Sequence, residues 1–267
     1  MLSRPQADLG VRPSPIFFAI VVFTAVAAWL TTGDLLSGTS SRVAVFAFII
    51  GAWTLSLIFH EFAHAFLAWR GGDRSVAQRG YLTLDPRTYT HPVLSFALPL
   101  VFIIMGGIGL PGGAVLLNRG VLSDARASIV ALAGPLTNLV LGCLSLALLG
   151  FDVIDSTTQP TLAGAVGFFG FLQIAVFVLN MLPVPGFDGY AVIESTLPDD
   201  TRQLLRPVAT YGPLIAILVI WRYEPIGDAF WGAVTLITEI FGVELDQWRC
   251  GYFQFRFWSS DIPAACR

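Results

Sequence analysis

The chain has 267 residues, of which 55% are hydrophobic and only 12% are charged, and its formal net charge at pH 7 is −3. A soluble domain carries about 25% charged residues, so the composition excludes an ordinary soluble domain and indicates a polytopic membrane protein. Every basic residue is an arginine, and the small negative net charge gives no support for nucleic-acid binding.

The N-terminal segment predicts a retained helix. Arg4 and Arg12 precede an apolar run at 16–30 that has no clear small-residue cleavage site after it, so a cleaved signal peptide is not expected. The next apolar stretches are separated by short loops, and spans of about 17–25 residues are long enough to cross a bilayer. The seven candidate spans are 15–32, 43–69, 93–110, 127–150, 161–182, 207–222 and 229–243.

The third candidate span differs from the others. Proline and glycine interrupt it repeatedly, at Pro99, at Gly106-Gly107 and at Pro111-Gly112-Gly113. Non-helical backbone persists at membrane depth only where protein or a water-filled cavity covers it. We therefore expect an all-α polytopic membrane protein of about six transmembrane helices, with a re-entrant segment near 93–113.

The arginines predict the orientation. If 93–110 is re-entrant, 13 of the 15 arginines fall on one side and only Arg42 and Arg222 on the other, whereas a spanning segment would split them 7 to 8. Cytoplasmic loops carry the arginine excess, so both termini are expected in the cytoplasm. We expect one transmembrane domain over 1–247, with its core at 43–195, and a short cytoplasmic tail at 248–267.

An H-E-x-x-H motif, His60-Glu61-Phe62-Ala63-His64, lies in the second span. Residues four apart on a helix share one face, about 5–6 Å apart at Cβ, so His60 and His64 are suited to hold one metal ion. Glu61 is placed to take a proton from a metal-bound water. The alternative is a structural cluster, but each ionisable residue inside a membrane helix costs about 2.5–3.5 kcal/mol or more, which favours a functional site.

A third ligand is expected because a catalytic zinc takes three protein ligands and leaves one position for water. His91 is the remaining histidine, and the carboxylates in apolar surroundings are Asp188, Glu194 and Glu239. Asp188 follows an apolar helix that prolines end, between Gly186 and Gly189. An ordinary helix-ending loop would look similar. The re-entrant topology, however, brings Asp188 to the same side and depth as the histidines. The three cysteines, Cys143, Cys250 and Cys266, show no paired spacing, so neither a disulfide framework nor a thiolate zinc site is expected.

The motifs taken together resemble those of the site-2 proteases, which are intramembrane zinc metalloproteases. His60–His64 matches the H-E-x-x-H of that family, and 180–189 matches its N-x-x-P-x-x-x-x-D-G. Ala133-Gly134-Pro135-Leu136-Thr137-Asn138 is similar to its A-G-P-x-x-N. The resemblance covers about 43–195 and is to the short type, without a PDZ-like domain.

The resemblance implies roles for these residues. His60, His64 and Asp188 would bind one Zn²⁺ per chain, and Glu61 would be the general base. Asn180 would contact the substrate backbone or the developing oxyanion. Asn138 is a weaker candidate for that role, because an asparagine among small residues also serves to join helices. His91 is a candidate for supporting a ligand or gating access.

The expected function is hydrolysis of peptide bonds in or near the transmembrane helices of single-span substrates, such as an anti-sigma factor or a signal-peptide remnant. The expected location is a bacterial cell membrane, and the re-entrant segment resembles the membrane-inserted β element of the family. Two alternatives are a membrane zinc-binding transporter, which would not need Glu61 beside its ligands, and an inactive scaffold relative, which the intact motifs disfavour.

Overall fold

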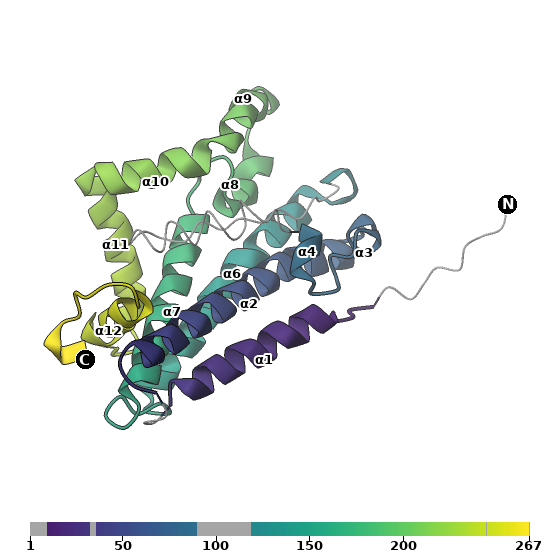
Figure 1. The fold of residues 1–267 in the computed structure, drawn as a ribbon. Helices are drawn as coiled ribbons and strands as arrows, with labels where there is room; N and C mark the ends of the chain where they lie inside the picture. Colours follow the sequence, from purple (N-terminus) through teal and green to yellow (C-terminus); the bar gives the residue numbers. More distant parts are fainter. Residues whose placement is uncertain (1–9, 33–35, 90–118, 244, 267) are drawn as a thin grey trace.

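A computed structural model describes residues 10–32, 36–89, 119–243 and 245–266, and this part of the chain is helical and contains no strand (Figure 1). Its α-helices are α1 (Pro15–Leu30), α2 (Thr39–Gly71), α3 (Ser75–Gln78), α4 (Pro86–Tyr89), α6 (Asp124–Gly150), α7 (Pro160–Asn180), α8 (Asp188–Ile193), α9 (Asp199–Leu205), α10 (Gly212–Arg222), α11 (Glu224–Glu239) and α12 (Leu245–Phe255). Short 3-10 turns are η2 (Arg119–Val121), η3 (Glu194–Thr196), η4 (Arg206–Thr210) and η5 (Ala264–Cys266). The predicted re-entrant segment at 93–113 lies outside the described residues.

Three of the described helices, α2, α6 and α7, are long and apolar enough to cross a membrane, with 33, 27 and 21 residues. The all-helical membrane architecture is therefore confirmed, but about six spans are not. The expected span at 207–222 is broken, because Pro207 and the Gly212-Pro213 pair interrupt it. The helices on the two sides of this break meet at 70°, and counting that pair as one span would give four spans.

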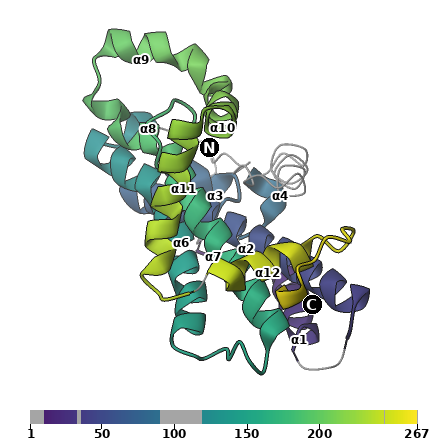
Figure 2. The ribbon, with the colours of Figure 1, turned by 90° about the vertical axis from the view of Figure 1, so that its left-hand side faces the viewer.

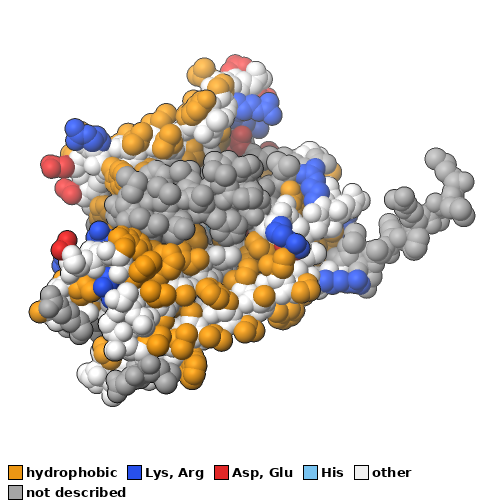
Figure 3. Space-filling model, viewed as in Figure 1, with side chains coloured by type: hydrophobic (Ala, Val, Ile, Leu, Met, Phe, Trp, Pro, Cys, Tyr) orange, Lys and Arg blue, Asp and Glu red, His pale blue; other side chains and the backbone are white. Residues whose placement is uncertain are grey.

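Helix α1 is a shorter apolar helix of 16 residues that packs along α2 (Figure 1). Ser14 caps its first turn by accepting a hydrogen bond from the Phe17 N–H at 3.1 Å, and Pro15 occupies the first helical position. The outer face of α1 exposes Phe18, Val22 and Trp29. Hydrophobic side chains also cover much of the surface seen in Figure 3, as expected of a surface that faces lipid.

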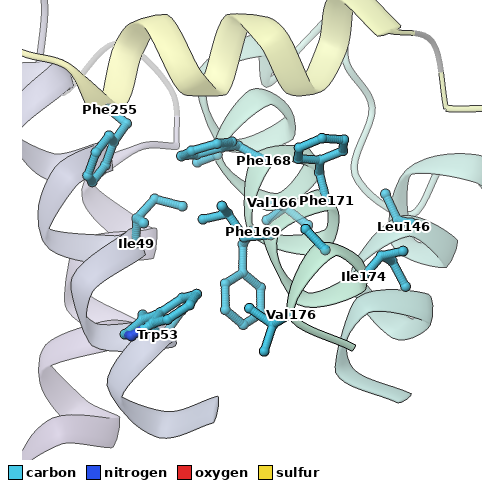
Figure 4. Packing of buried hydrophobic residues seen from close by; sticks show 14 of the residues in the cluster. Ile49, Trp53, Leu146, Val166, Phe168, Phe169, Phe171, Ile174, Val176 and Phe255 are labelled. Carbon is cyan, nitrogen blue, oxygen red and sulfur yellow. The ribbon is translucent and has the colours of Figure 1, made fainter. Parts of the chain in front are cut away.

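Helix α7 is the centre of the bundle. It packs against α2, α6, α11 and α12, and most of its side chains are buried. A helix that is apolar on every face belongs in the interior. Its Phe168, Phe169 and Ile174 meet Ile49 of α2 and Leu146 of α6 in the main core (Figure 4).

Helix α12 closes one end of this core. Phe255 is fully buried, and the Trp248 ring stacks on Phe171 of α7 with 3.9 Å between centroids. The backbones approach closely at Gly164 and Gly251, where a Cβ on Gly251 would collide with the Gly164 carbonyl. The segment 248–267, which was expected to be a short tail, thus supplies side chains to the core.

The C-terminal residues also correct two other expectations. Cys250 and Cys266 form a disulfide, which the spacing did not predict, because the turns after α12 fold the chain back on itself. Arg42 at the start of α2 donates to the Arg256 and Ser259 carbonyls at 2.6 Å each. Arg12 instead lies at the other end of the bundle, where its N–H bonds the Leu82 carbonyl. The described ends of the chain thus lie at opposite ends of α2 (Figures 1 and 2), and Arg42 lies beside Arg256, an arrangement that the arginine argument did not predict.

Candidate metal centre

Two helices of the bundle and a short third helix meet at the H-E-x-x-H motif. His60 and His64 lie one turn apart on α2 and are both buried, in agreement with the spacing argument. After α7 ends at Asn180, the chain turns through Pro183 and Gly186, whose φ of +103° is a conformation that favours glycine. This turn returns the chain to the histidines and places Asp188 at the first position of α8.

The three predicted ligands converge. Asp188 Oδ2 lies 3.2 Å from His60 Nε2 and 3.4 Å from His64 Nε2, and the two Nε2 atoms are 3.1 Å apart. A tetrahedral zinc with bonds of about 2.0–2.2 Å separates its ligand atoms by roughly 3.3–3.6 Å. The triad therefore forms one face of a tetrahedron of nearly the size that zinc requires, and among the described residues it is the only group of this kind.

Hydrogen bonds on the far side of each ring orient both histidines. His64 Nδ1 donates to the Val130 carbonyl at 2.7 Å, and His60 Nδ1 lies 2.6 Å from Asn138 Oδ1. A ring that carries its single proton on Nδ1 presents the lone pair of Nε2 to the centre. Support of this kind fixes the ring tautomer in metal sites. With the Asp188 carboxylate, three electron-pair donors converge, and such a donor set suits a cation.

Gly134 of α6 leaves the space that an ion needs. A Cβ on Gly134 would lie 2.5 Å from His60 Nε2 and closer still to His64 Nε2, so it would occupy almost the same position as a metal bound to both nitrogens. Val130, Gly134 and Asn138 recur every four residues and therefore form one face of α6. This need for space is a reason for glycine at position 134 that the motif alone does not show.

The other candidate site residues differ in their surroundings. Glu61 is buried, 3% exposed, and it interacts electrostatically with His64. Asn180 is buried, and its Nδ2 has no hydrogen-bond partner. Asn138 contacts a ligand instead, which favours a supporting role over contact with the substrate. Glu194 and Glu239 do not belong to the metal-binding group. His91 lies outside the described residues.

Comparison with known proteins agrees with this site. No family model matches the chain, and no solved structure matches it. A Mycobacterium tuberculosis protein named "Putative zinc metalloprotease Rip2" is 44% identical over 255 residues, which cover 94% of this chain and 96% of that protein. The chain belongs to the site-2 protease-like family.

Other members of the site-2 protease-like family are similar over shorter or equal lengths. Rip2 of Mycolicibacterium smegmatis is 41% identical over 254 residues, covering 94% of this chain and 96% of that protein. A Bacillus subtilis protein named "Putative zinc metalloprotease YwhC" is 28% identical over 197 residues, which cover 70% of this chain and 84% of that protein. The names support a protease role and zinc as the metal for this site-2 protease-like chain.

Proposed function

We propose that this chain is an intramembrane zinc metalloprotease that hydrolyses peptide bonds in or near the transmembrane helices of single-span substrates. The observation that carries the proposal is the His60–His64–Asp188 triad, whose ligand atoms lie 3.1–3.4 Å apart inside an apolar helical bundle. The names of the relatives support zinc as the ion. The buried Glu61 beside the triad favours hydrolysis over metal transport.

The residues divide the chemistry among them. His60, His64 and Asp188 would hold the ion, which when bound would act as a Lewis acid that polarises a carbonyl and lowers the pKa of water. Glu61 accepts a proton from the attacking water and returns it to the leaving amine. Asn180, whose buried Nδ2 lacks a partner, supplies a hydrogen-bond donor to the oxygen on which negative charge develops.

The substrate must present an extended backbone, since a helix engages its own carbonyls in hydrogen bonds. Easily unwound single-span helices, with Gly, Pro, Asn or Ser near the cut, are therefore the preferred substrates. Replacing those residues in the substrate by Leu should slow cleavage by an order of magnitude or more, and an unchanged rate would exclude this requirement.

We also propose an orientation in a bacterial cell membrane, with about six spans. Arginines concentrate at the metal-site end of the described chain, which by the positive-inside tendency is the cytoplasmic end. These are Arg12, Arg70, Arg74, Arg79, Arg87, Arg119, Arg126, Arg202 and Arg206. The opposite end carries the Cys250–Cys266 disulfide, which suits an oxidising exterior. Cysteine-labelling reagents that do not cross the membrane should reach reduced Cys250 or Cys266 from outside only.

The deciding experiment is cleavage of a panel of single-span model substrates by the purified protein in liposomes. Wild type is compared with Glu61→Gln and with Glu239→Gln, a control at an exposed glutamate outside the site, and the metal content of all three is measured. We expect about one zinc in each protein and cleavage by all except Glu61→Gln. Zinc in all three without cleavage would favour a transport or scaffold function, and absence of zinc from wild type would exclude the site.

A further inference from the structure

A line of buried polar side chains leads away from His60 through three helices. His60 Nδ1 lies 2.6 Å from Asn138 Oδ1 of α6, and Asn138 Nδ2 donates to Gln173 Oε1 of α7 at 2.8 Å. Gln173 Nε2 donates to Ser56 Oγ of α2 at 3.1 Å, and Ser56 Oγ donates to the Trp53 carbonyl at 2.8 Å. Gln173 is fully buried, and the other side chains in the line are at most 4% exposed.

The far end of this line has a fixed direction because a backbone carbonyl can only accept a hydrogen bond. The Ser56 hydroxyl therefore donates to Trp53, and its oxygen is left to accept from Gln173 Nε2. Gln173 then turns its Oε1 towards Asn138, which donates through Nδ2. Asn138 Oδ1 consequently faces His60 and accepts the proton of Nδ1. Each amide orientation follows from the one before it.

The reverse arrangement would have a chemical consequence. If both amides turned over, Asn138 would donate to His60 Nδ1, and the ring proton would move to Nε2. That nitrogen would then carry a proton where the metal site needs a lone pair. Both arrangements satisfy the two amides equally well, so only the Ser56–Trp53 end distinguishes them.

The second histidine has no such freedom. His64 Nδ1 bonds directly to the Val130 carbonyl at 2.7 Å, and this acceptor cannot turn over. The two ligands of one metal therefore have different supports, a backbone atom for His64 and a relay of three side chains for His60. Metal affinity responds to partners that lie beyond the ligands, commonly by 10–100-fold.

We propose that Gln173 and Ser56 are positioning residues that hold His60 in its metal-binding tautomer, by fixing the orientation of Asn138. The proposal rests on the metal centre of the proposed function, but it concerns the ring of the metal-free protein and is testable there. Neither residue touches a ligand atom of the metal. The sequence carries one sign of this role, since Gln173 is the one polar side chain in the run 162–179, and polar groups inside a membrane bond across helices.

The test uses the full chain labelled with ¹⁵N-histidine. The chain has only 3 histidines, so the ring nitrogens are readily resolved, and His64 serves as an internal reference. Metal-free wild type should show both His60 and His64 protonated on Nδ1. Zinc affinity is then measured in the same samples by competition with a chelator.

Ser56→Ala and Gln173→Met should each shift His60 to a mixture of tautomers and leave His64 unchanged. Zinc binding should weaken on the order of tenfold. Compared with Gln173→Met, Gln173→Glu should bring the His60 tautomer ratio and the zinc affinity back towards the wild-type values, since a carboxyl group keeps an acceptor facing Asn138 Nδ2. Ser145→Ala is the matched control, because the buried Ser145 bonds its own helix at the Leu141 carbonyl and is not part of the line.

Two outcomes would overturn the proposal. One is that His60 stays protonated on Nδ1 in both Ser56→Ala and Gln173→Met, with unchanged zinc affinity. The other is that His60 and His64 change together, or change equally in Ser145→Ala, which would indicate general loss of structure. A wild type that binds no zinc but shows the expected histidine pattern would contradict the proposed function and leave this inference standing.

Discussion

The two ends of the helical bundle are held together by different kinds of interaction. At the metal-site end, ordered polar groups meet inside apolar surroundings, and the His60 ring depends on the orientation of Asn138 and Gln173. At the other end, α12 closes the bundle with stacked rings such as Trp248 on Phe171, with the buried Phe255, and with a disulfide. The net contribution of one hydrogen bond to stability is only about 0.5–1.5 kcal/mol. A large aromatic side chain, by contrast, buries about 150–250 Å² of surface area. The metal-site end therefore determines function, and the α12 end contributes more to the stability of the fold.

The largest effect should follow from Gly134→Ala. The added methyl group would occupy the space next to both Nε2 atoms, so most of a zinc binding free energy on the order of 10 kcal/mol should be lost. The methyl group would also collide with both buried rings, so the metal-free protein should lose about 1–3 kcal/mol of stability as well. Metal analysis and thermal melting in detergent measure the two effects. Gly232→Ala is the control, since a Cβ there meets nothing within 4 Å, and a Gly134→Ala protein with full zinc would break the comparison.

At the capped end, Phe255→Ala should have the opposite outcome. Removing this fully buried ring leaves a cavity and should lower the free energy of unfolding by about 3–5 kcal/mol. The zinc affinity of the folded fraction should stay within about twofold, because the ring does not contact the site. Phe151→Ala, at a ring residue that is 78% exposed, should have almost no effect. Loss of zinc affinity in folded Phe255→Ala would show that the two ends are coupled.

Removal of the disulfide should have a smaller effect on the same end. Cys250→Ser with Cys266→Ser opens a loop with a sequence separation of 16, for which the expected loss is about 3 kcal/mol. Thermal melting with and without a reductant should give equal values in the double variant and different values in wild type. The free Cys143 provides the control substitution Cys143→Ser. No response of wild type to the reductant would exclude a stabilising bridge.

The smallest effect concerns a polar pair near the metal-site end. Hydrogen bonds from Arg87 to Asp85, at 2.7 and 3.0 Å, hold the pKa of that carboxyl below its usual value. A lowered pKa contributes stability above the unfolded pKa of about 3.9, and this contribution is lost as the pH falls through the lower folded value. Asp85→Asn should therefore destabilise by no more than about 1 kcal/mol at pH 7, because Arg87 is exposed to solvent.

The pH dependence sharpens this last prediction. The difference in melting temperature between wild type and Asp85→Asn should shrink as the pH falls below about 4. Asp199→Asn, which removes a more exposed pair with Arg202, should change the melting temperature at pH 7 less than Asp85→Asn does. A difference for Asp85→Asn that grows in acid would contradict the assigned sign.

The metal ligands could be predicted from the sequence because their chemistry is unusual in an apolar helix. Histidines four apart and a carboxylate between glycines each stand out against membrane-spanning residues, and the structure brings all three together. Gln173 and Ser56 could not be assigned, because a lone amide or hydroxyl in a helix shows that it needs a partner but not which one. Ser56, Asn138 and Gln173 lie on three different helices, and the sequence does not show which faces of these helices meet.

The fold was predicted less completely at the C-terminal end. The spans that became α2, α6 and α7 are long, uniform and apolar, so their hydropathy determines them. After residue 205 the apolar runs are short and interrupted by Pro207 and Pro213, and direction changes of this kind depend on packing. The disulfide was missed for the same reason, because Cys250 and Cys266 become neighbours only after the chain has turned back.

The position of α12 has a consequence for how the protein is made. Its residues leave the ribosome after α2 and α7, although Phe255 and Trp248 fill gaps between those earlier helices. Domains generally begin to fold from the N-terminal side during synthesis. The core between α2 and α7 therefore stays incomplete until α12 has been synthesised. A chain that is released before that point would leave this part of the core accessible to the quality-control proteases of the membrane.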